Sequence, residues 1–111
     1  MTELITDKKE IEKIISEKIK VKKLVFTTHY KLGSANRAIS DETVLEIIPK
    51  FEKVIAIEID KLKLGDIGYE LFYQISNNLT FSIATVPKED KVKIIHVVEY
   101  RRSLSKRFRQ K

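Results

Sequence analysis

A small set of side chains in this chain can transfer protons or stabilise negative charge. They are two histidines, a tyrosine and two arginines, namely His29, His96, Tyr100, Arg37 and Arg101. Imidazole and phenol groups act as general acids or bases, and guanidinium binds phosphate oxygens in a bidentate geometry. The chain has no cysteine, which excludes thiol catalysis and thiolate metal sites. The two histidines lie 67 residues apart, so a zinc site would need carboxylates to complete it. We therefore expect no metal and no other cofactor.

The first candidate cluster has helical spacing. His29, Gly33 and Arg37 follow one another at four-residue intervals, which places them on one face of a short helix predicted from Thr28 to Arg37. Gly33 leaves room between the two larger side chains, so this face can hold a phosphate. In the alternative interpretation His29 packs at a joint between strand and helix, and Arg37 pairs with an acidic residue of the next helix.

The second candidate cluster lies at the end of the last predicted strand, from Lys91 to Tyr100. His96 falls on one row with Val92, Ile94, Val98 and Tyr100, and its functional interpretation is a general acid or base on an open sheet face. The alternative is a hydrogen-bonded histidine within the sheet. Arg101 follows at the end of the strand.

The net charge of +6 is concentrated in residues 101–111, which contain six cations and no acid. Besides Arg101, we expect four of them to contact RNA: Arg102, Lys106, Arg107 and Arg109. A basic segment favours a polyanionic partner. The alternative is a solvated, structureless tail.

The pattern of apolar residues predicts the elements that position these groups. Asp7 is a plausible N-cap of a first helix with an isoleucine stripe, and Ser40 caps another that ends before Pro49. Residues 24–26 form a short strand, and beyond Pro49 the apolar period changes from 3.6 to 2. We therefore expect an α+β fold, with N-terminal helices packed on one face of an antiparallel sheet of about four strands.

A hairpin is predicted around Ser76-Asn77-Asn78. We expect a three-residue loop, because it places seven apolar residues of the two strands on one face. These residues are Tyr69, Leu71, Tyr73, Ile75, Leu79, Phe81 and Ile83.

Length and composition predict a single domain over residues 1–111. Residues 1–22 form an N-terminal helix that can be an added element, and residues 101–111 form a basic C-terminal tail. The N-terminus lacks the apolar stretch of a signal peptide, and no apolar run is long enough for a membrane span. We expect a cytoplasmic protein that does not contact membranes.

Two stretches carry a resemblance to a known family. The segment THYKLGSANRAISDETV, from Thr28 to Val44, is similar to an entry motif that reads His, seven residues, Arg, any residue, Ile, Ser. The segment from Tyr69 to Arg102 resembles the sheet and basic terminus of BrnT and RelE-type toxins. The entry motif is typical of an uncharacterised branch of that superfamily, which shares a fold with barnase-like and colicin-type ribonucleases. The resemblance covers about residues 24 to 109 and implies a RelE/barnase-like sheet.

The resemblance implies a toxin-like endoribonuclease that cleaves RNA without metal, with mRNA on the ribosome as one substrate and a small acidic antitoxin as its inhibitor. It assigns phosphate stabilisation to Arg37, Arg101 and Arg102. Proton transfer falls to His29 or His96, and base stacking or proton donation to Tyr100. The alternatives are a non-catalytic nucleic-acid-binding module and a protein-interaction module that forms a homodimer. Gly33 stands where the family often carries a second arginine, which favours the alternatives.

Overall fold

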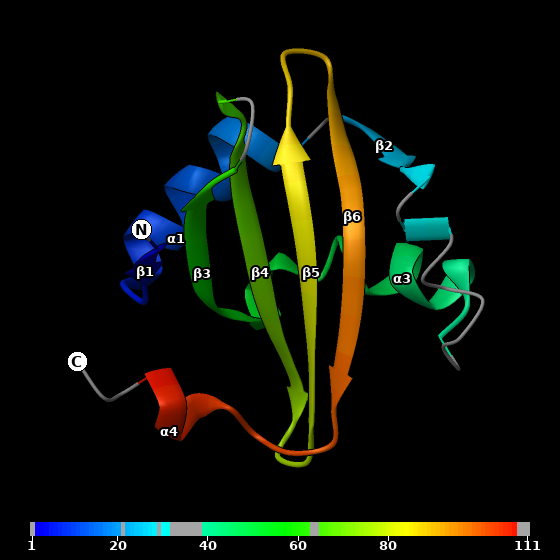
Figure 1. The fold of residues 1–111 in the computed structure, drawn as a ribbon. Helices are drawn as coiled ribbons and strands as arrows, with labels where there is room; N and C mark the ends of the chain where they lie inside the picture. The colour runs from blue at the N-terminus through cyan, green and yellow to red at the C-terminus, as the bar shows by residue number, and fades with distance from the viewer. Residues whose placement is uncertain (1, 21, 29, 32–38, 63–64, 109–111) are drawn as a thin grey trace.

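The computed structural model describes residues 2–20, 22–28, 30–31, 39–62 and 65–108. This described part is built around one six-stranded sheet with the order β1-β3-β4-β5-β6-β2 (Figure 1). Neighbouring strands are antiparallel except β2 and β6, which run parallel. The strands are β1 (Thr2–Ile5), β2 (Lys23–Phe26), β3 (Val54–Lys61), β4 (Ile67–Ser76), β5 (Leu79–Pro87) and β6 (Lys91–Tyr100).

The expected fold class is therefore wrong. We predicted helices packed on an antiparallel sheet of about four strands, of the RelE/barnase-like type, and the sheet has six strands of mixed direction. The four antiparallel strands from Val54 to Tyr100 form its centre, and two short segments extend it at the edges. β1 pairs with β3, and β2 pairs with the first four residues of β6. The short strand predicted at residues 24–26 is β2, but its place beside β6 was not expected. β1 was missed, because only a helix was expected in residues 1–22 and a strand of four residues gives a very short pattern.

The helices begin where their capping residues predict. The carboxylate of Asp7 accepts a hydrogen bond of 3.0 Å from the backbone N–H of Glu10, and helix α1 (Lys8–Ile14) follows and continues as the π-helix η1 (Ile15–Ile19). The hydroxyl of Ser40 accepts a bond of 3.1 Å from the N–H of Thr43 at the start of α3 (Asp41–Ile47). A short 3-10 helix, η2 (Phe51–Lys53), leads into β3. The helix predicted from Thr28 to Arg37 lies mostly outside the described residues.

The main core lies between α1, η1, α3 and one face of the sheet, which we call the first face. The isoleucines of the first helix pack there against the central strands, together with Val44 and Ile47 of α3. Tyr73 is completely buried, and its hydroxyl donates a 2.7 Å hydrogen bond to the carbonyl of Ile48. The buried cluster comprises Ile5, Ile11, Ile15, Ile19, Tyr30, Val44, Ile47, Ile48, Val54, Ile57, Leu71, Tyr73, Phe81, Ile83, Val92, Ile94 and Val97.

The predicted face alternation of the β4–β5 hairpin is confirmed. Leu71 pairs with Ile83 and Tyr73 with Phe81, so these residues share the first face. Phe72, between them, lies on the opposite side of the sheet. The turn itself differs from the expected three-residue loop. Ser76 pairs with Leu79, which leaves two turn residues, and the register shifts between Gln74 and Ser76. The bulge restores the alternation that a two-residue turn would otherwise invert.

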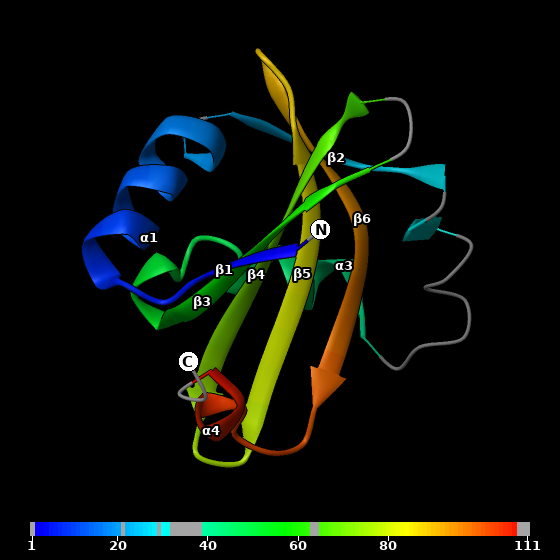
Figure 2. The same cartoon turned by 60° about the vertical axis from the view of Figure 1, so that its left-hand side comes forward.

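The opposite side of the sheet, the second face, is partly covered by the C-terminal segment. A one-turn helix, α4 (Ser105–Phe108), lies at the foot of the sheet (Figures 1 and 2). Leu104 and Phe108 pack against Ala56 and Phe72, and the two phenylalanine rings meet edge to face at 4.8 Å. Residues 101–108 are therefore docked on the sheet, which contradicts the alternative of a structureless tail for this part of the segment.

Candidate functional site

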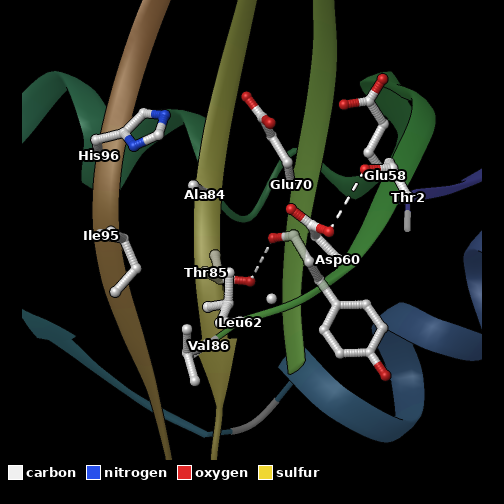
Figure 3. Close-up of a pocket in the computed structure, with 12 residues that line it drawn as sticks. Thr2, Glu58, Asp60, Leu62, Glu70, Ala84, Thr85, Val86, Ile95 and His96 are labelled. Carbon is white, nitrogen blue, oxygen red and sulfur yellow. Dashed lines mark hydrogen bonds between the residues drawn. The ribbon is translucent and has the colours of Figure 1, made fainter. Parts of the chain in front are cut away.

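The second face carries a hollow of about 170 Å³ beside the part covered by α4. One row of directly paired residues crosses four strands there: Glu58 on β3, Glu70 on β4, Ala84 on β5 and His96 on β6. Figure 3 shows the side chains of Glu70 and His96 on either side of the small Ala84. The row places an imidazole and two carboxylates around one depression.

A β-bulge decides that His96 lies on this face. Ala84 pairs with His96 and Thr85 pairs with Ile94, so Ile95 is the extra residue of β6. Val92 and Ile94 belong to the main core before the bulge, and Val97 does so after it. Strict alternation along the sequence would place His96 on one row with Val92 and Ile94. Because of the bulge, His96 instead lies on the opposite face from these two residues.

The charge around the hollow is negative. Glu58, Glu70 and Asp60 all line it. Glu58 accepts a 3.0 Å hydrogen bond from the guanidinium of Arg107, and Asp60 accepts one of 3.4 Å from the hydroxyl of Thr2. The carboxylate of Glu70 makes no hydrogen bond or ion pair with any residue that the structure describes. These carboxylates repel a phosphate, so a phosphate on this face is least disfavoured at the His96 end of the row, farthest from Glu58.

Tyr100 and His96 lie on the same face but not at one centre. Tyr100 pairs with Thr80 and His96 with Ala84, a separation of four residues along β6. At about 3.3 Å per residue this places their Cα atoms about 13 Å apart. Both side chains would have to lean toward each other to contact one phosphate, so these two residues do not form one compact catalytic centre in this structure.

The C-terminal end of β6 presents a second candidate feature. We call this region, Tyr100 and the two arginines after it, the foot of β6. The guanidinium carbon of Arg102 lies 5.7 Å from the centroid of the Tyr100 ring, within the range of a cation–π contact. Arg101 is exposed, with a loose ion pair of 3.7 Å to Glu99. The backbone is fixed at this point, because the Thr80 hydroxyl donates a 3.0 Å hydrogen bond to the carbonyl of Arg102.

The remaining predicted cations have different surroundings. Lys106 is exposed. Arg107 is bound within the molecule: besides its ion pair with Glu58, its guanidinium carbon lies 5.4 Å from the ring centroid of Phe72 and 5.3 Å from that of Phe108. Arg109 lies outside the described residues. Arg107 thus helps to anchor α4, and Glu58 competes with a phosphate for its guanidinium.

The N-terminal candidate cluster cannot be placed. His29, Gly33 and Arg37 all lie outside the described residues, as does most of the entry motif that carries the family resemblance. The described part of the chain contains no group of three or more His, Cys, Asp or Glu residues close enough to hold a metal ion. In that same part, no helix has both the length and the apolarity that a bilayer crossing requires.

Sequence reasoning missed the acidic side of the hollow. Strict alternation along β4 places Glu70 on the face opposite Leu71 and Tyr73, but its neighbour Glu58 depends on the register between β3 and β4. The loop between these strands contains the turn residues Gly65 and Asp66, but its sequence does not fix which residues of β3 and β4 pair. Only the paired sheet shows that the two carboxylates lie directly opposite each other.

Comparison with protein-family models, curated proteins and solved structures finds no match to this chain. The resemblance to RelE and BrnT toxins therefore has no support beyond the short motifs that suggested it.

Proposed function

We propose that this protein binds single-stranded RNA through the foot of β6 and the segment that follows it. The observation that carries the proposal is the pairing of the Tyr100 ring with the Arg102 guanidinium, next to the exposed side chains of Arg101 and Lys106. An aromatic ring and neighbouring arginines supply the two contacts that single strands require, a stacking surface for a base and cations for the backbone.

The electrostatics of this surface favour a polyanion. Residues 100–106 contain three cations and no acid. Arg101 has an exposed fraction of 84% for its side chain, so its ion pair with Glu99 is weak and a phosphate can replace it. A stacked base contributes about 1–3 kcal/mol, which makes Tyr100 the residue that distinguishes RNA from a generic polyanion.

Fluorescence anisotropy with a labelled single-stranded RNA tests the proposal. The triple variant R101Q/R102Q/K106Q should bind at least about tenfold more weakly at 0.1 M salt, because three counterion-releasing contacts are lost. The matched control is K9Q/K13Q/K18Q, which removes the same charge from exposed lysines of α1 and η1. Equal affinity of both triple variants would show that net charge alone, and not this surface, attracts RNA.

A metal-independent endoribonuclease of the toxin type is the second candidate function. The observation that favours it is the position of His96, which lines the hollow on the same face as Tyr100. In this proposal the imidazole transfers a proton while the ribose 2′-OH attacks the phosphate, and an acidic antitoxin occupies the cations at the foot of β6. RNA incubated with the protein in EDTA, with and without ribosomes, should then be cleaved to 2′,3′-cyclic phosphate ends. His96→Gln should abolish the cleavage, and intact RNA with the wild-type chain would exclude this candidate.

A further inference from the structure

Small side chains form the hollow on the second face. Gly68 and Ala84 lie on neighbouring strands, and the lack of bulk at these two positions leaves space above the sheet. A Cβ atom at Gly68 would lie 3.2 Å from the Cδ1 atom of Leu62, so Leu62 packs closely over the glycine and forms one wall. Val86 and Ile95 add apolar surface. At about 170 Å³ the hollow is smaller than a pocket for a drug-sized ligand and has the scale of a single side chain.

The negative charge of Glu70 at this hollow is not balanced by a cation of any described residue. Glu58 and Glu70 are direct cross-strand partners, an arrangement that destabilises a sheet when both are ionised. Arg107 neutralises Glu58, but no described residue does the same for Glu70. Asp60 adds a further carboxylate at the rim. A cation that enters the hollow would relieve this repulsion.

The same face already binds a cation of this kind. The guanidinium of Arg107 contacts the Glu58 carboxylate at 3.0 Å and lies 5.4 Å from the centroid of the Phe72 ring. A carboxylate next to apolar sheet surface therefore holds an alkylguanidinium group in this molecule. The hollow repeats that combination one strand further along the row, with Glu70 as the carboxylate and the apolar surface around Ala84 as the floor.

We propose that the hollow binds a cationic group on an apolar stem, an alkylguanidinium or alkylammonium. A lysine or arginine side chain of a partner and a free alkylamine share this chemistry. The site is separate from the proposed RNA surface, because none of Arg101, Arg102 and Lys106 lines it. It selects for positive charge, whereas the foot of β6 selects for negative charge.

Titration of the isotope-labelled full chain, followed by NMR, tests this proposal with agmatine and with the peptide acetyl-Gly-Arg-Gly-amide as probes. Both should shift the signals of Gly68 and Ala84, and acetate should not. Glu70→Gln should weaken the binding of either probe about tenfold, because a charge-assisted contact is lost. Glu89→Gln, which removes an exposed carboxylate in the β5–β6 turn, should leave the affinity unchanged.

Two further measurements distinguish a partner's side chain from a free amine and test whether the hollow itself is the binding site. Tighter binding of the peptide than of agmatine would assign the site to a partner's side chain, and the reverse order would assign it to a free amine. Ala84→Leu should abolish binding by filling the hollow, and the chemical shifts of the main core verify that this variant is folded. The absence of shifts at Gly68 and Ala84 at millimolar probe, or equal affinity of Glu70→Gln and the wild type, would overturn the proposal. Neither result bears on RNA binding.

Discussion

Replacement of Phe108 by alanine tests whether α4 is a docked part of the sheet. Phe108 has an exposed fraction of 5% and contacts Phe72 edge to face at 4.8 Å. Burial of a phenylalanine side chain contributes about 1.5–3 kcal/mol, and an aromatic pair adds about 0.5–1.5 kcal/mol. A helix of one turn has little stability of its own, so we expect the segment to detach from the sheet once this contact is lost.

The expected loss is about 2–4 kcal/mol of the free energy of unfolding, measured by urea denaturation followed by circular dichroism. Leu45→Ala is the matched control, because Leu45 on α3 is a large apolar residue that is 45% exposed, and it should cost well under half as much. Detachment also frees Arg107 from Glu58. The salt dependence of RNA binding should then steepen by about 0.7 in the logarithmic slope, the contribution of one more phosphate contact. A Phe108→Ala protein as stable as the wild type would refute the packing of α4.

Two further predictions concern stability and its dependence on pH. Tyr73→Phe should lower the free energy of unfolding by about 1–2 kcal/mol in urea denaturation, because the buried carbonyl of Ile48 loses its donor. Burial also raises the pKa of Tyr73, so the stability of the wild type should fall above about pH 10, where the tyrosine ionises only in the unfolded chain. In the variant this fall should be less steep. The contradictory result is an identical alkaline profile for both proteins. The 2.6 Å hydrogen bond from Lys88 lowers the pKa of Asp66, so this pair stabilises the fold above the ordinary carboxyl pKa and loses its effect as the pH falls through the lowered pKa. Asp66→Asn should therefore lower the melting temperature slightly at pH 7 and converge with the wild type in strong acid, and a difference that persists at pH 2 would contradict this assignment.

The elements that the sequence predicts correctly are those with a local physical signal. Asp7 and Ser40 are N-caps whose side chains accept a hydrogen bond from the backbone N–H three residues later, and both helix starts are confirmed. The hairpin faces follow from strict alternation on both sides of one turn. These features need no knowledge of distant parts of the chain.

The features that the sequence does not predict depend on distant pairings. β1 pairs with β3, more than fifty residues away. The strand at residues 24–26 is predicted, but its parallel pairing with β6 is not. The bulge at Ile95 moves His96 relative to the core row and has no glycine to mark it. In the C-terminal segment, Leu104 and Phe108 are spaced four residues apart, a helical signal that the surrounding positive charge obscures.

The salt dependence of RNA binding tests the central claim most directly. With Arg101, Arg102 and Lys106 in contact with phosphates, the logarithm of the affinity should fall with the logarithm of the salt concentration at a slope of about −2. The slope should approach zero in R101Q/R102Q/K106Q and stay near −2 in K9Q/K13Q/K18Q. A slope that the first variant leaves unchanged, or that both variants reduce equally, would contradict the assignment of RNA binding to the foot of β6.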